Sequence, residues 1–227
     1  MKTFNQDIQK NITPRAALHL LKDGNSRFVN NLKANRDLLS QVNETSDAQW
    51  PFAIILSCID SRTSAELIFD LGLGDIFSVR IAGNIVNTDI IGSMEFACKI
   101  AGSKLIVVLG HTKCGAVKGA CDHVEMGNLT ELLSKLQPAV YEEKTIKEHR
   151  DSSNAVFVEN VAQLNVKRAV KNIIERSFIL ENMIENGNIG IVGAMYNIEN
   201  GRVEFYDDAT YIKDEENDNL NLDALKH

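Results

Sequence analysis

Two short patterns in this sequence carry the residue types that hold transition metals in proteins. The first is Cys58-Ile59-Asp60-Ser61-Arg62, and the second, about fifty residues later, is His111-Thr112-Lys113-Cys114. Zinc accepts thiolate and imidazole ligands, and three protein ligands leave its fourth tetrahedral position free, as in a catalytic rather than a structural site. We therefore predict that Cys58, His111 and Cys114 bind Zn²⁺, provided that the fold brings the two patterns together.

The second pattern would be weak evidence by itself. Five histidines and four cysteines in 227 residues produce one His-x-x-Cys match by chance in about one chain in eleven. Both patterns, however, directly follow apolar runs that read as buried strands. The competing interpretation is a pair of buried cysteines and a surface histidine. For the other two cysteines, Cys98 and Cys121, we expect buried packing rather than redox chemistry.

The first pattern also contains a carboxylate and a guanidinium that could act together. Asp60 lies two residues after a predicted zinc ligand, and Arg62 lies two residues further on. A carboxylate held by a bidentate arginine stays ionised and can orient a zinc-bound hydroxide by accepting its hydrogen bond. Freed from Arg62, the same carboxylate could reach the zinc and block it. The alternative is that Asp60 caps the next helix and Arg62 is a solvated surface charge.

Strand and helix signals alternate along the chain, which is typical of a parallel sheet covered by helices. Strands are expected at 52–56, 75–81, 104–109 and 189–196, and a two-residue Asn200-Gly201 hairpin turn should return the chain antiparallel at 202–206. The sequence therefore predicts a single α/β domain with a mostly parallel central sheet, of about four parallel strands plus one antiparallel edge strand, flanked by helices. Ligands collect at the carboxyl ends of such strands, where both metal patterns fall.

The amino-terminal region reads as a helical arm over residues 1–50. Thr13 as N-cap and Pro14 at the first helical position begin a helix, which Gly24 and Asn25 should interrupt, and a polar connection follows over 30–49. At the other end of the chain, residues 213–227 are acidic and poor in apolar clusters, so we expect a loose tail.

Further helix signals occupy the segments between the strands. Thr63 and Glu66 have the form of a capping box, which predicts a helix to about residue 71. Other helices are expected at 92–101, from about 113, at 129–136 and at 155–185. We expect Gly110 to end the third strand and Pro138 to end the helix at 129–136.

Composition argues against two classes of partner. Lysine plus arginine total 24 against 31 aspartate plus glutamate, a net charge of −7, which disfavours nucleic acid and anionic membranes. The longest apolar runs, 52–56 and 105–109, are far below the roughly 20 residues that cross a bilayer, and residues 1–10 show no secretory signal. We expect a soluble, cytoplasmic protein.

Several further segments occur in an order that closely resembles the β-class carbonic anhydrases, from Thr13 to about Tyr206. They are Thr13-Pro14 with Gly24-Asn25 and Arg27-Phe28, Arg80-Ile81-Ala82-Gly83-Asn84, Gly92-Ser93-Met94-Glu95-Phe96-Ala97, and Val192-Gly193-Ala194-Met195-Tyr196. The resemblance implies zinc-dependent, reversible hydration of carbon dioxide to bicarbonate and a proton. It also implies a homodimer or homotetramer with active sites at the subunit interface.

The same resemblance suggests substrate-binding residues. Gln49 stands nine residues before the first zinc cysteine and would donate a hydrogen bond to substrate, whereas Phe77 and Phe96 would line an apolar pocket, partly across the interface. Relatives with this glutamine tend to have an open site, so we predict that Asp60 pairs with Arg62 and stays off the metal. The alternative for Gln49 is an ordinary loop amide.

The sequence departs from the family pattern at three positions. Phe96 stands where many relatives carry tyrosine, and Ile59 and Thr63 replace the serine and valine often found there. Two other functions stay open at this point. One is a hydrolase of the same fold that acts on carbonyl sulfide or carbon disulfide, and the other is a zinc-stabilised regulatory module without catalysis. An orienting dyad and a free fourth ligand position oppose the second.

Overall fold

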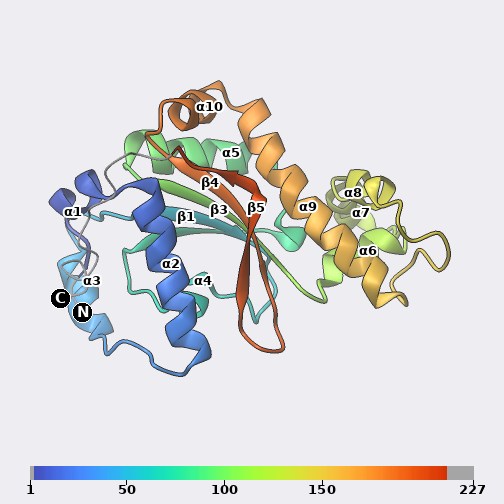
Figure 1. Ribbon diagram of the computed structural model, residues 1–227, viewed down its shortest axis with the longest axis horizontal. Helices are drawn as coiled ribbons and strands as arrows, with labels where there is room; N and C mark the ends of the chain where they lie inside the picture. The colour runs from blue at the N-terminus through green and yellow to red at the C-terminus, as the bar shows by residue number, and fades with distance from the viewer. Residues whose placement is uncertain (1–2, 214–227) are drawn as a thin grey trace.

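A five-stranded sheet organises this protein. The computed structural model describes residues 3–213, and its strands are β1 (Ala53–Ser57), β2 (Ile76–Arg80), β3 (Leu105–His111), β4 (Gly190–Tyr196) and β5 (Val203–Tyr211). Their spatial order is β2-β1-β3-β4-β5, with β5 antiparallel to β4 and the other neighbouring pairs parallel (Figure 1). The predicted α/β fold, with four parallel strands and one antiparallel edge strand, is confirmed.

Helices precede β1 and lie between successive strands as far as β4 (Figure 1). None of the helices in the described part of the chain is long and apolar enough to span a membrane. Their bounds are α1 (Gln6–Asn11), α2 (Pro14–Val29), α3 (Leu38–Glu44), α4 (Ala65–Ile68), the 3₁₀ turn η1 (Ala82–Asn84), α5 (Thr88–Glu95), the π-helical turn η2 (Phe96–Ile100), α6 (Gly115–Cys121), α7 (Gly127–Ser134), α8 (Gln137–Glu142), α9 (Ala155–Arg176) and α10 (Phe178–Glu185).

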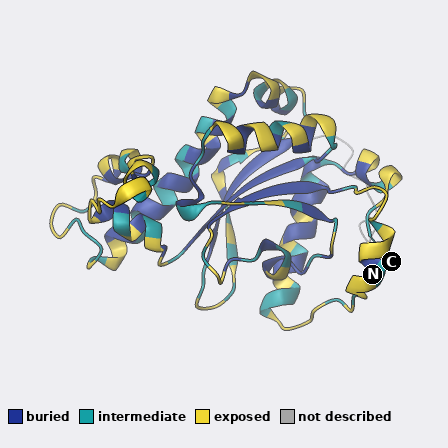
Figure 2. Ribbon diagram, turned by 180° about the vertical axis from the view of Figure 1, so that it is seen from behind, coloured by how far each residue is buried: buried dark blue, intermediate teal, exposed yellow. Residues whose placement is uncertain are grey.

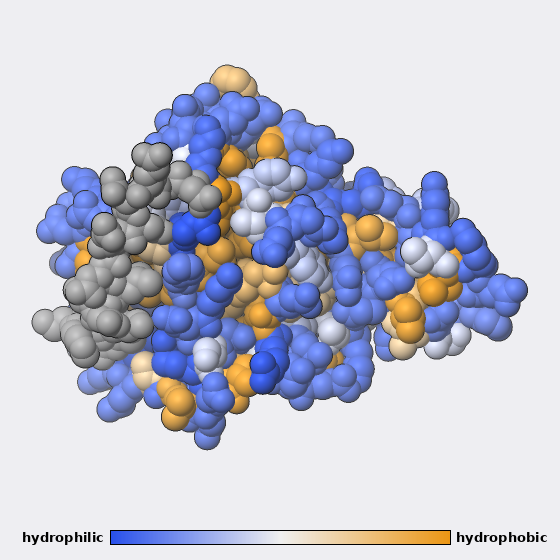
Figure 3. Space-filling view, in the orientation of Figure 1, coloured by the Kyte–Doolittle hydropathy of each residue, from blue (hydrophilic) through white to orange (hydrophobic). Residues whose placement is uncertain are grey.

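Helices cover both faces of the sheet, so its inner strands are apolar along their whole length. Every residue of β1, β3 and β4 is buried (Figure 2). Because alternate strand residues face opposite sides, Ile54 and Leu56 join a core with α5, α6 and α9, whereas Ala53 and Ile55 join a second core with α2 and α4. Each fully buried aliphatic side chain stabilises the fold by about 1.5–3 kcal/mol. The outer surface in Figure 3 is mainly hydrophilic, with smaller hydrophobic areas.

The amino-terminal arm is more helical than the sequence indicated, and the helix break expected at Gly24 and Asn25 is absent. α1 precedes the predicted first helix, α3 lies within the predicted polar connection, and α2 continues through both residues. Gly24 and Asn25 instead contact neighbouring segments of the chain. A Cβ on Gly24 would lie 1.8 Å from the carbonyl oxygen of Phe69, and the Asn25 amide donates to the carbonyls of Ile68 and Gly201.

Two other local signals were wrong because distant contacts override them. Thr63 does not cap α4: the cap position belongs to Ser64, and the Thr63 hydroxyl bonds backbone carbonyls of the preceding turn. Gly110 does not end β3. It lies within the strand, where a Cβ would approach Cγ2 of Val166 in α9 to 2.5 Å, so its missing side chain lets α9 pack against the sheet.

Three boundaries in the carboxy-terminal half also differ from expectation. Pro138 lies in the first turn of α8 rather than at the end of a helix. The helical region expected at 155–185 is divided at Ser177, whose side chain caps α10. The hairpin connection at Asn200-Gly201 is longer than two residues, because β4 ends at Tyr196 and β5 begins at Val203. Apart from Lys213, the predicted acidic tail lies outside the described residues.

A buried carboxylate anchors the segment between α2 and α3. The Asp70 side chain is 5% exposed and pairs with Arg27 at 2.5 Å and with Arg36 at 2.7 Å. It also accepts a hydrogen bond from the backbone N–H of Ala34. Burial alone would raise the pKa of Asp70, but the bonds from Arg27, Ala34 and Arg36 keep that pKa below its ordinary value. This cluster fixes the arm against the domain.

The substitution Asp70→Asn should lower the free energy of unfolding by about 3 kcal/mol at pH 7, because the largely buried Arg36 loses the carboxylate with which it pairs. Urea denaturation measures this difference. Asp207→Asn, at an exposed position of β5, is the control and should stay within about 0.5 kcal/mol of the parent.

The difference in the free energy of unfolding between Asp70→Asn and the parent should depend on pH. Because the folded-state pKa of Asp70 is depressed, its contribution is present above the unfolded-state pKa and is lost as the pH falls below about 4. The stabilities of Asp70→Asn and the parent should therefore converge in acid. A gap that stays constant down to pH 3 would contradict the assignment.

Candidate metal centre

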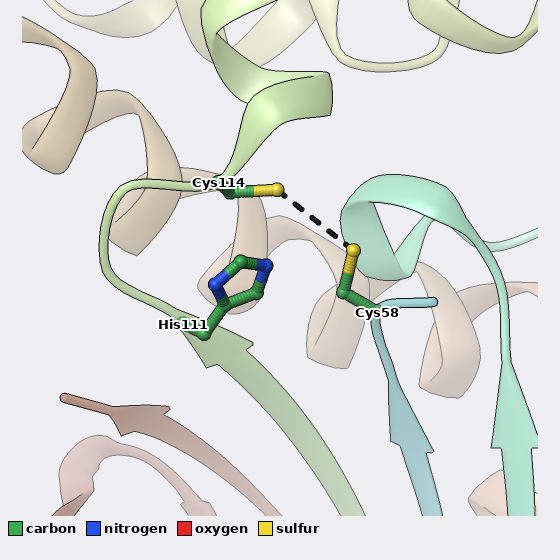
Figure 4. Close-up of side chains that lie close together, drawn as sticks. All are labelled: Cys58, His111 and Cys114. Carbon is green, nitrogen blue, oxygen red and sulfur yellow. Dashed lines mark hydrogen bonds between the residues drawn. The ribbon is translucent and has the colours of Figure 1, made fainter. Parts of the chain in front are cut away.

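The parallel pairing of β1 with β3 brings the two sequence patterns together. Ser57 at the end of β1 stands opposite Leu109 of β3, so the residues that follow each strand leave the sheet at the same edge. His111 is the last residue of β3, and Cys114 is the N-cap residue of α6. Figure 4 shows the Cys58, His111 and Cys114 side chains converging from these elements.

The three side chains form one compact, buried cluster. Their ligand atoms all lie within 4.8 Å of one another, and the residues are 4%, 1% and 2% exposed. The Cys58 and Cys114 sulfurs are 3.9 Å apart. Two Zn–S bonds of about 2.3 Å at a tetrahedral angle place sulfurs about 3.8 Å apart, so the pair has the spacing that one zinc ion requires.

The orientation of His111 also suits a metal ligand. Its Nδ1 lies 2.9 Å from the carbonyl oxygen of Thr112, and because a carbonyl can only accept, Nδ1 carries the hydrogen. The lone pair is then on Nε2, which is buried and has no hydrogen-bond partner among the described residues. A buried nitrogen lone pair without a partner is costly, and a metal ion beside the two sulfurs would satisfy it.

The two thiols influence each other's ionisation. A hydrogen bond from Cys114 stabilises the Cys58 thiolate and lowers the pKa of Cys58. The pKa of Cys114 is raised, because losing its proton would break that bond and place a second negative charge in a buried site. The pair therefore holds one proton in common. A divalent cation would replace that proton and allow both sulfurs to ionise.

Asp60 is paired with Arg62 beside this cluster. Its two carboxylate oxygens accept from Nε and Nη2 of Arg62 at 2.8 and 2.7 Å, and one also accepts from the Arg62 backbone N–H at 3.0 Å. The side-chain bond from Arg62 is the main reason that the pKa of Asp60 lies below its ordinary value. The structure thus pairs Asp60 with Arg62, and Asp60 is not a member of the metal-ligand cluster.

Backbone and side-chain groups that no sequence pattern indicated surround the Cys58 sulfur. The backbone N–H of Gly83 donates to Cys58 Sγ at 3.4 Å, and Asn165 of α9 donates to the Gly83 carbonyl at 2.9 Å. Gly83 has a φ of 66°, a left-handed conformation that glycine adopts easily. The contact between Gly83 and Cys58 joins residues 25 positions apart in the sequence, so it depends on the fold.

An apolar cavity adjoins the cluster on the side of α6 and α7. Its volume is about 270 Å³, close to the lower end of the roughly 300–1,000 Å³ typical of ligand pockets. Its walls combine the metal-side residues with small and aliphatic side chains, namely Cys58, Ile59, Asp60, Ala82, Gly115, Ala116, Gly119, Leu129 and Leu133. The cavity suits a small molecule with little polarity.

The predicted substrate-binding residues lie elsewhere in the same chain. Gln49 is exposed and precedes β1, whereas Cys58 follows that strand, and five strand residues span about 13 Å. Phe77 and Phe96 contact each other edge-on, with ring centroids 6.2 Å apart. They line a separate cavity of 610 Å³ at the open edge of β2. One chain therefore does not bring these three residues to the cluster.

The substitutions Cys58→Ala, His111→Ala and Cys114→Ala should each abolish stoichiometric zinc binding, because two remaining ligands hold the ion too weakly. Metal analysis after dialysis measures zinc per chain. Cys98→Ala is the matched control, since Cys98 is a buried thiol of η2 outside the cluster, and it should retain zinc. One tightly bound zinc per chain in Cys114→Ala would refute the ligand assignment.

The chain is similar to known proteins over most of its length. The model of the family described as carbonic anhydrase matches residues 53–203. The chain is 34% identical over 203 residues to carbonic anhydrase 2 of Mycobacterium tuberculosis, covering 87% of this chain and 95% of that protein. It is 36% identical over 203 residues to the carbonic anhydrase of Mycolicibacterium smegmatis, covering 86% and 94%.

Solved structures show the same similarity. The β-carbonic anhydrase CafA of Aspergillus fumigatus is 27% identical, with a TM-score of 0.65 over 86% of this chain and 90% of that one. A structure from a study of two tetrameric β-carbonic anhydrases of Sordaria macrospora is 25% identical, with a TM-score of 0.62 over 74% of this chain and 90% of that one.

Proposed function

Because the chain belongs to the β class of the carbonic anhydrase family, we propose that it catalyses the reversible hydration of carbon dioxide to bicarbonate and a proton. We propose that Cys58, His111 and Cys114 hold the Zn²⁺ for this reaction. The supporting observation is the buried, unpartnered Nε2 of His111 beside two thiols with zinc-like spacing. The expected cytoplasmic location remains a prediction.

The protein residues would prepare the site in distinct ways. When bound, zinc would supply a Lewis acid that makes a coordinated water more acidic. The Thr112 carbonyl fixes the ring of His111 by accepting from Nδ1. Backbone N–H groups of Ala116 and Val117, at the start of α6, stabilise the Cys114 thiolate. These contacts hold the ligands ready for the metal.

Asp60 would orient the nucleophile. Its bonds with Arg62 keep its pKa below the ordinary value, so the carboxylate is ionised at neutral pH and can accept a hydrogen bond but not donate one. A nucleophilic oxygen that donates its hydrogen to Asp60 would turn a lone pair towards the substrate. The apolar cavity formed by Ile59, Leu129 and Leu133 would hold carbon dioxide, which is small and carries no net charge.

A second copy of the chain would complete the substrate pocket. Gln49, Phe77 and Phe96 lie away from the metal cluster of their own chain, yet the open edge of β2 and the exposed Phe96 are available to a partner. We propose that these residues reach the cluster of a neighbouring subunit in a homodimer or homotetramer. The similarity to a structure from a study of tetrameric β-carbonic anhydrases of Sordaria macrospora supports an oligomer.

Stopped-flow measurement of carbon dioxide hydration by the zinc-loaded protein tests the proposed reaction. We expect a rate well above the buffer background between pH 7 and 9, and a background rate throughout that range would refute the proposal. Arg62→Ala should keep zinc yet lose activity by roughly tenfold to a hundredfold, because Asp60 loses its partner. Arg176→Ala, an exposed arginine at the end of α9, is the control and should match the parent.

A subunit-mixing experiment tests whether the site is shared. Gln49→Ala and Cys58→Ala should each be impaired alone. In mixed dimers one site has an intact metal cluster together with the partner's intact Gln49, so random mixing should restore about one quarter of the parent activity. If Gln49 acted within its own chain, mixing would restore no activity, and the shared-site proposal would be wrong.

A further inference from the structure

The turn that carries Asp60 is held from outside by two side chains that bond the same pair of carbonyls. The Thr63 hydroxyl lies 2.9 Å from the carbonyl oxygen of Cys58 and 2.8 Å from that of Asp60. Arg80 donates from Nε to the Cys58 carbonyl at 3.0 Å and from Nη2 to the Asp60 carbonyl at 2.6 Å. Nη2 also lies 3.4 Å from the Thr63 hydroxyl. We call this arrangement the carbonyl clamp.

Thr63 and Arg80, the two members of the clamp, both lie beside the turn that follows β1. Thr63 is 1% exposed and follows the turn directly. Arg80 ends β2 and stands opposite Ser57, the residue before Cys58. Among the described residues Arg80 forms no ion pair with a carboxylate, so its charge is directed to the two carbonyls. Charge-assisted bonds of this kind are stronger than neutral ones.

The clamp acts on the backbone that the Asp60–Arg62 pair requires. The Asp60 carboxylate accepts from the backbone N–H of Arg62, a local bond that forms only while the turn is closed. The Asp60 carbonyl, in turn, accepts from the Thr63 N–H at 3.0 Å and from Arg80 Nη2, and it shares the single hydroxyl hydrogen of Thr63 with the Cys58 carbonyl. By fixing this carbonyl, the clamp fixes the direction in which the Asp60 side chain leaves the backbone.

The ion pair between Asp60 and Arg62 is, by itself, too weak to fix the position of the Asp60 carboxylate. The Arg62 side chain is 52% exposed and that of Asp60 is 17% exposed, so water screens their attraction and competes for both groups. A divalent cation beside Asp60 would attract the same carboxylate. A rigid backbone is therefore needed to keep the carboxylate on Arg62.

We propose that Thr63 and Arg80 are positioning residues that keep the Asp60 carboxylate on Arg62 and thereby leave the fourth metal position open to small ligands. This inference rests on the metal site of the proposed function, but not on carbon dioxide as its substrate.

The test uses the full-length protein loaded with Co²⁺, whose visible absorption reports its ligands, and thiocyanate as the probe. If Asp60 occupies the fourth position, thiocyanate must displace it and binds more weakly. Thr63→Val removes the hydroxyl with little change of shape. Arg80→Met removes the charge and the donors, whereas Arg80→Lys keeps the charge but loses the forked geometry. Ser64→Ala, which removes the neighbouring hydroxyl outside the clamp, is the control.

We expect the thiocyanate dissociation constant to rise roughly tenfold in Arg80→Met and roughly threefold in Thr63→Val, with Arg80→Lys between them, as for the loss of single hydrogen bonds. The spectrum without thiocyanate should change in the same order. Ser64→Ala should stay within twofold of the parent.

Parent-like spectra and thiocyanate affinity in Thr63→Val would overturn the proposal, even if Arg80→Met failed to fold. Weakened binding with an unchanged starting spectrum would also overturn it, because Asp60 would then not have moved to the metal. These outcomes are independent of catalysis. A parent protein that binds no Co²⁺ would instead refute the metal site, and a clamp effect in a protein without hydration activity would refute only the proposed reaction.

Discussion

The rest of this structure depends on two thiols that meet in a buried site with their sulfurs 3.9 Å apart. At that distance and burial, two thiolates repel strongly, so the pair either shares a proton or needs a cation. Cys58 follows β1 and Cys114 precedes α6, so their approach requires β1, β3 and the start of α6 to be aligned. The apolar cores on both faces of the sheet supply that alignment.

Around this pair the protein concentrates polar contacts at one edge of an otherwise apolar sheet. Thr63 and Arg80 hold the carbonyls of the turn after β1, Gly83 donates to the Cys58 sulfur, and Arg62 holds Asp60. Each contact acts on a ligand or on the carboxylate beside it. The cavity that opens next to them is lined mainly by small and aliphatic residues. The candidate metal ligands and Asp60 are thus fixed by polar contacts, beside a cavity whose walls would suit a small uncharged molecule.

The same edge of the sheet does not hold every group that the proposed reaction uses. Gln49 precedes β1, at the opposite end from Cys58, and Phe77 and Phe96 face the open side of β2. A sheet strand separates its two ends by a fixed rise per residue, so no side-chain rotation in one chain closes this gap. In the proposed pocket, Gln49 would therefore have to come from a second copy of the chain.

Local features of the sequence predicted the approximate positions of the strands, the α/β class and the candidate metal ligands Cys58, His111 and Cys114. Apolar runs and residue spacing can be recognised without knowing the fold. Only the tertiary structure shows where contacts between distant residues override a local sequence preference. Gly24 continues a helix because Phe69 packs against it, and Thr63 holds carbonyls rather than capping α4. The fold also places Gln49 at the opposite end of β1 from Cys58. Such outcomes depend on contacts between residues remote in sequence, whose energies exceed local propensity.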